Sequence, residues 1–139
     1  MKRQCTRAKV DKKAVSSRTR GLKLLPYTIR ENLPILGSQR RLGGRVKALV
    51  RWIAADGSLT WYVTEGSARR NREGKAVDYL LYGLIVGQSR RLDYFWLSDF
   101  TNDHGPMGRR VERDLRWQPK TLGEIAPEMF RSPDDHMED

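Results

Sequence analysis

The sequence contains a single cysteine, Cys5, and this scarcity excludes several kinds of cross-link and metal site. A disulfide within the chain needs two cysteines. Cysteine-built zinc sites and iron–sulfur clusters need several thiolate ligands. The sequence therefore predicts a protein of a reducing compartment, and we expect a cytoplasmic location.

Long apolar segments are missing as well. The longest nearly apolar run covers residues 79–86, whereas a helix needs roughly 20 apolar residues to span a bilayer. The first residues also lack the apolar stretch of a secretory signal peptide. We therefore expect a soluble protein with no membrane partner.

Positive charge is abundant and unevenly distributed. The 139 residues include 27 Lys or Arg and 17 Asp or Glu, which gives a net charge of +10 with both histidines neutral. Residues 1–20 hold eight basic groups and one acidic group, and residues 126–139 hold five acidic groups and one basic group. Neither end has the apolar period of a helix or strand, so neither can bury enough surface to offset its ordering entropy. We predict a flexible basic arm over 1–20, a single domain over 21–125 and an acidic, mostly flexible tail over 126–139.

Two β-strands are predicted in the first half of this domain. Residues 59–65 are rich in β-branched and aromatic residues, which favour strands. The Asp56-Gly57 pair before them is a strong hairpin signal. Residues 45–53 alternate, and four of them are predicted to share one buried face: Val46, Ala48, Val50 and Trp52.

Further along the chain, a polar segment precedes the most apolar one. Residues 66–76 are arginine-rich and are predicted to form a loop. Residues 77–86 are apolar on both faces, which is typical of a buried strand, although a short buried helix gives the same pattern. Gly83 within this segment indicates a bulge or a close backbone approach. Two more strands are predicted over 92–97 and 111–117.

Short helices are predicted at three places. Thr28 and Glu31 have the spacing of a capping box, and so do Thr121 and Glu124. Ser98 can begin a brief third helix. The sequence thus predicts an α+β fold: a four- to five-stranded, mainly antiparallel meander sheet with two or three short helices that cover one face.

Five motifs in fixed order carry a resemblance: Thr-Trp-Tyr-Val-Thr-Glu-Gly (60–66), Tyr-Leu-Leu-Tyr-Gly-Leu-Ile-Val-Gly (79–87), Leu-Asp-Tyr-Phe-Trp-Leu-Ser-Asp-Phe (92–100), Gly-Pro-Met-Gly (105–108) and Val-Glu-Arg-Asp-Leu (111–115). Together they resemble the bacterial domain-of-unknown-function 2958 family over roughly residues 24–125. The resemblance implies an accessory protein of a plasmid, phage or integrated mobile element. It implies no catalytic residue. The chain departs from the family in its basic arm, its 69–75 loop and its acidic tail.

The arginine-rich segments are the strongest functional signal. In an up-and-down meander, alternate connections lie at the same end of the sheet. The residues before the first strand should therefore meet the 67–76 loop and form one basic cluster. The candidate nucleic-acid-binding residues are Arg40, Arg41, Arg45, Arg69, Arg70, Arg72 and Lys75. Such a cluster, aided by the arm, would bind the phosphates of DNA or RNA with weak sequence preference.

Other interpretations stay open. Arginine-rich loops also occur as solvated surface, and an acidic protein could be the partner, which would make the chain an interaction or inhibitor module. A third hypothesis is a metal-dependent enzyme that uses Glu65, Glu112 and Asp114. However, Glu112 and Asp114 are more easily explained by salt bridges that tie the last strand to the sheet. The sequence has no H-E-x-x-H motif, nucleophile elbow or phosphate-binding glycine loop. We therefore predict no catalytic residue, metal site or cofactor, and leave enzymatic activity open as the less favoured interpretation.

Overall fold

The computed structural model describes residues 24–100 and 104–130. The predicted basic arm over 1–20 lies outside the described residues, and so do residues 131–139 of the predicted tail. Within the described part of the chain, no helix is long and apolar enough to cross a membrane.

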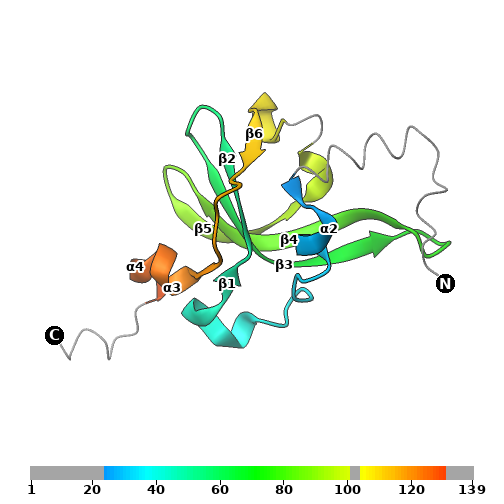
Figure 1. Cartoon of the computed structure of the whole chain (residues 1–139), viewed down its shortest axis with the longest axis horizontal. Coiled ribbons are helices and arrows are strands. Elements are labelled where there is room, and N and C mark those ends of the chain that lie inside the picture. The colour runs from blue at the N-terminus through cyan, green and yellow to red at the C-terminus, as the bar shows by residue number, and fades with distance from the viewer. Residues whose placement is uncertain (1–23, 101–103, 131–139) are drawn as a thin grey trace.

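An antiparallel sheet forms the centre of the fold (Figure 1), and its strand order is β5-β4-β3-β2-β6. The strands β2 to β5 make the predicted meander, and β6 returns to pair with β2. The strands are β2 (Val50–Ala54), β3 (Thr60–Arg70), β4 (Ala76–Val86), β5 (Arg90–Trp96) and β6 (Val111–Arg113). A separate two-stranded sheet pairs β1 (Lys47–Ala48) with β7 (Lys120–Thr121). The α+β prediction is confirmed.

The first predicted hairpin is present. β2 pairs with β3, and Trp52 lies opposite Trp61. Between them Gly57 has a positive φ of 77°, which glycine adopts without steric cost, and the Asp56 carboxylate accepts a hydrogen bond from the Ser58 N–H. The four residues predicted to share a buried face are all buried. Their strand breaks at Leu49, however, so that the first two pack in a different core from the last two.

The predicted loop over 66–76 is wrong. β3 continues to Arg70 and β4 begins at Ala76, so the turn holds only residues 71–75. The polarity of this segment indicates exposure on both faces rather than a lack of strand structure. A two-stranded ribbon that is solvated on both sides has no apolar alternation to detect.

The apolar strand β4 contains the predicted irregularity. A β-carbon at Gly83 would collide with the carbonyl oxygen of Tyr62 on the neighbouring strand. The register shifts between Val63 and Glu65, so Thr64 is the bulged residue. Its hydroxyl donates a hydrogen bond to the Tyr82 carbonyl at 3.0 Å. Gly83 is therefore needed where the two backbones approach closely.

Hydrophobic clusters form on both faces of the sheet. The first contains Trp52, whose indole N–H donates to the Leu24 carbonyl at 2.7 Å, together with edge-on Phe95 and Phe100 rings. It also receives Ile29 of α2 (Tyr27–Arg30). The second lies beneath the 3₁₀ helix η2 (Arg40–Arg45) and the helices α3 (Leu122–Ile125) and α4 (Pro127–Phe130). The expectation that helices cover one face is therefore wrong, because helical segments pack against both.

The predicted boundary of the acidic tail also needs correction. Ala126 is fully buried, and α4 packs Met129 and Phe130 against the second cluster. Because these apolar side chains lie among acidic residues, the overall composition of 126–139 does not indicate that part of this segment packs against the core. The ordered domain therefore extends through Phe130.

The helix starts were predicted with mixed success. The capping box of Thr121 and Glu124 is present at the start of α3. The one predicted for Thr28 is absent, because the helix begins two residues earlier: the Pro26 carbonyl already accepts the N–H groups of Ile29 and Arg30. The helix predicted from Ser98 is the short 3₁₀ helix η3 (Leu97–Asp99). The strand predicted over 111–117 is β6, which ends at Arg113.

Candidate nucleic-acid interface

The seven predicted cationic residues do not form one cluster. Arg40, Arg41 and Arg45 lie in η2, beside α3 and α4, whereas the other four lie at the far end of the β3–β4 hairpin (Figure 1). Both groups lie beyond the same end of the sheet in a meander, which is why one cluster is predicted. The strands differ in length, however: β3 and β4 have eleven residues each, against five in β2 and seven in β5. The long hairpin carries its arginines away from η2.

The side chain of Arg40 binds other side chains of the protein. Its guanidinium carbon lies 3.8 Å from the centre of the Tyr82 ring, and its Nη2 donates to the Tyr94 hydroxyl at 2.7 Å. Its Nε lies 3.5 Å from a carboxylate oxygen of Glu65. The Tyr94 hydrogen bond is the main reason that the pKa of Arg40 is raised. These contacts make Arg40 a structural residue that holds η2 against the sheet.

Glu65 has a structural role too. Its side chain is only 1% exposed, and its two carboxylate oxygens accept the backbone N–H groups of Gly37 and Gln39, each at 2.8 Å. The carboxylate thereby fixes the loop that leads into η2. Both oxygens are directed at backbone donors of this loop rather than at a shared metal position.

The other two carboxylates of the proposed metal site point elsewhere. Glu112 is exposed and lies 3.9 Å from Arg110, and Asp114 forms an ion pair with Arg51 of β2 at 3.1 Å. Across residues 24–100 and 104–130, no group of three or more His, Cys, Asp or Glu side chains is placed to hold a metal ion. The carboxylate cluster of the third hypothesis does not form. The Asp114 pair does tie the segment after β6 to the sheet, as expected.

Most arginines of the described surface fall into two classes. Six of them lie close to a carboxylate: Arg40, Arg51, Arg90, Arg91, Arg109 and Arg110. By contrast, Arg41, Arg45, Arg69, Arg72 and Arg116 are exposed and have no acidic partner among the residues that the structure describes. The Arg70 guanidinium donates to the Gly74 carbonyl at 2.9 Å. The second class contains four of the seven residues predicted from the sequence.

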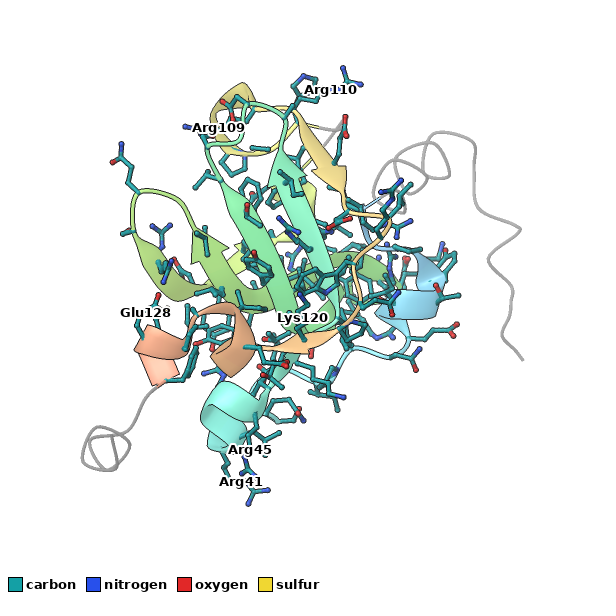
Figure 2. All side chains as sticks on the ribbon, turned by 60° about the vertical axis from the view of Figure 1, so that its left-hand side comes forward. Arg41, Arg45, Arg109, Arg110, Lys120 and Glu128 are labelled. Carbon is teal, nitrogen blue, oxygen red and sulfur yellow. The ribbon has the colours of Figure 1, made fainter. Side chains whose placement is uncertain are left out.

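Two lysines beside η2 were not predicted. The pairing of β1 with β7 places Lys47 opposite Thr121 and Ala48 opposite Lys120, so the two ammonium groups belong to one small sheet. Figure 2 shows Lys120 above Arg41 and Arg45, whose side chains reach away from the body of the protein. We call Arg41, Arg45, Lys47 and Lys120 the η2 surface. No local sequence signal predicts this grouping, because the strands that form it are far apart in the chain.

One carboxylate lies within the η2 surface. The pKa of Glu124 is lowered, mainly by a hydrogen bond from the Thr121 backbone N–H, then by the Thr121 hydroxyl and by the positive field of Lys120 and Lys47. Its charge is therefore directed at the start of α3. It offsets part of the field of the two lysines, and neither arginine of the surface forms an ion pair with it or with another described carboxylate.

The second basic group is the tip of the hairpin, residues 69–75. Every residue from 69 to 77 is exposed. The turn is nevertheless well defined, because the Asn71 side-chain oxygen accepts the N–H groups of Glu73 and Lys75 at 2.9 and 3.0 Å. Gly74 has a positive φ of 85°, which allows the chain to reverse there. The hairpin tip thus presents its cations on an ordered support.

Comparisons of this chain with protein-family models, with curated proteins and with solved structures gave no match.

Proposed function

We propose that this protein binds nucleic acid through low-specificity electrostatic contacts. The observation that carries the proposal is that Arg41 and Arg45 of the η2 surface and Arg69 and Arg72 of the hairpin tip are exposed and have no acidic partner within residues 24–100 and 104–130. The positive charge of an arginine that is paired with a carboxylate is largely cancelled, so the pair attracts a phosphate only weakly. An unpaired guanidinium is free to bind phosphate oxygens in a bidentate manner.

The spacing of the two groups favours an extended polyanion. A small anionic ligand would need converging cations, whereas a nucleic acid offers phosphates along its whole length. Binding of this kind releases counterions, so the affinity must fall steeply with salt. For five neutralised phosphates on duplex DNA, the slope of log affinity against log salt concentration is about −4.5.

The cellular setting is part of the same proposal. The resemblance to the domain-of-unknown-function 2958 family supports an accessory role in a mobile genetic element. The cysteine usage of the sequence supports a cytoplasmic location. The second candidate function is a protein-interaction or inhibitor module, because an acidic protein surface would meet the same unpaired arginines.

Fluorescence anisotropy with a labelled 30-base-pair duplex, titrated between about 50 and 200 mM salt, tests the proposal. The double variants Arg41→Ala/Arg45→Ala and Arg69→Ala/Arg72→Ala should each weaken binding about tenfold at low salt. Arg90→Ala/Arg91→Ala is the matched control, since it removes the same charge from arginines that lie beside Glu128 and Asp93. It should weaken binding less.

Two results would overturn the proposal. One is an absence of binding at about 50 mM salt, and the other is an affinity that does not change with salt. Capture of a protein partner from nuclease-treated lysate, combined with either result, would support the interaction module instead.

A further inference from the structure

The outer part of the β3–β4 hairpin is a free two-stranded ribbon. β5 last pairs with β4 at Leu80, which lies opposite Ser67 of β3. Beyond this point neither strand has a further neighbour in the sheet. Three more residues of β3, 68–70, extend the ribbon by about 10 Å before the turn begins. Figure 1 shows the ribbon projecting from the sheet.

The base of this ribbon is anchored, and its tip is free. The Asp78 carboxylate accepts hydrogen bonds from the Ser98 N–H at 3.1 Å and the Ser98 hydroxyl at 2.6 Å. The guanidinium of Arg30 lies 4.6 Å from the centre of the Tyr79 ring. Asp78 is the cross-strand neighbour of Arg69, but it is held by Ser98 rather than by that arginine. The ribbon is thus fixed where it leaves the sheet, and Arg69 has no ion pair with any acidic residue in the described part of the chain.

The tip has a shape and a charge that suit binding in a groove of duplex DNA. Two paired strands lie about 4.8 Å apart. The major groove of B-form DNA is about 12 Å wide and 8.5 Å deep, and it admits a two-stranded ribbon. The tip carries Arg69, Arg70, Arg72 and Lys75 against one acid, Glu73. The Asn71 hydrogen bonds hold the turn in one conformation, so less entropy is lost on binding.

We propose that the hairpin tip enters the major groove of duplex DNA. Arg69 and Arg72 contact the phosphates that flank the groove and the edges of guanines on its floor, while the η2 surface binds backbone phosphates elsewhere. This inference rests on the proposed function, since it names the kind of nucleic acid and the element that recognises it. It also excludes duplex RNA as an equal ligand, because the A-form major groove is too narrow and deep for a ribbon to read.

The test compares duplex DNA with duplex RNA of the same sequence by anisotropy at fixed salt. We expect the full-length protein to bind the DNA about tenfold more tightly, since guanine contacts are available only there. Arg69→Ala/Arg72→Ala should remove this preference. Arg41→Ala/Arg45→Ala, which removes the same charge, should weaken binding to both duplexes alike and keep the preference. Both pairs are exposed, and unchanged melting temperatures would show that each variant is folded.

Footprinting with dimethyl sulfate gives an independent readout, because this reagent methylates guanine N7 in the major groove. The wild-type protein should protect guanines, and the Arg69→Ala/Arg72→Ala variant should not. Equal affinity for the two duplexes, or guanine N7 atoms that stay unprotected at saturating protein, would overturn the proposal that the hairpin tip enters the major groove. Binding that still weakened with salt would uphold the proposed function in that case. Failure to bind either duplex would overturn both.

Discussion

The buried carboxylate of Glu65 accepts the backbone N–H of Gln39 across 2.8 Å, and its other oxygen accepts a second N–H from the same loop. The sheet thus holds the connection to η2 through a charged acceptor rather than through apolar packing. Charge-assisted hydrogen bonds of this kind are stronger than neutral ones, and a donor left unpaired in the interior is costly.

Replacing Glu65 by Gln should lower the free energy of unfolding by about 2–3 kcal/mol, because an amide has only one acceptor oxygen for two N–H donors. Urea denaturation checks this. Glu112→Gln is the matched control, since Glu112 is exposed, and it should change stability by less than about 0.5 kcal/mol. Equal effects of the two substitutions would contradict the structural role of Glu65.

Gly83→Ala should destabilise the protein by about 3 kcal/mol or more. The added methyl group would meet the Tyr62 carbonyl, and backbone atoms in the middle of a sheet cannot move aside as a flexible side chain can. A thermal melt compared with that of Ser89→Ala, an exposed turn position, measures the effect. Similar melting temperatures for the two variants would mean that the strands separate easily at the bulge.

The capping box of α3 predicts a pH effect with a definite sign. The pKa of Glu124 lies below its ordinary value of 4.5 because the Thr121 N–H and hydroxyl bind the ionised form. The folded state is therefore favoured by this group above pH 4.5, and the contribution is lost as the pH falls through the lowered pKa. Thr121→Ala should move the pKa of Glu124 back toward its ordinary value. An NMR titration that finds the pKa unmoved would refute the hydroxyl contribution.

Phe130→Ala tests the corrected end of the domain. The ring is partly buried in the second cluster and packs close to Gly44 of η2. We expect a loss of about 1–2 kcal/mol, less than for a fully buried phenylalanine. Unfolding by urea gives the value, with Glu128→Ala as an exposed control on the same helix. If residues 126–130 were flexible, as their composition suggests, the two variants would behave alike.

Several features set by neighbouring residues were predicted correctly from the sequence, although the capping box at Thr28 was not. The Asp56-Gly57 turn, the buried face that includes Trp52, and the capping box of Thr121 each depend on residues a few positions apart. Gly83 was also identified, because an isolated glycine in an apolar strand commonly marks a bulge or a close approach of two backbones.

Features that depend on distant residues were not predictable. The pairing of β1 with β7 and the return of β6 to β2 join segments that share no local pattern. The extra length of β3 was hidden by its polar end, and this error led to the prediction of one basic cluster. The role of Arg40 depends on two tyrosines that only the fold brings near it.

The break in the strand at Leu49 has a consequence for how the protein is made. The segment before it, η2 with β1, packs against β7, α3 and α4, all of which lie near the end of the described chain. On a ribosome, the contacts of that segment with β7, α3 and α4 can form only after those elements have been synthesised. The η2 surface, which includes Lys120 of β7, is therefore completed only after strands β2 to β5 have been synthesised.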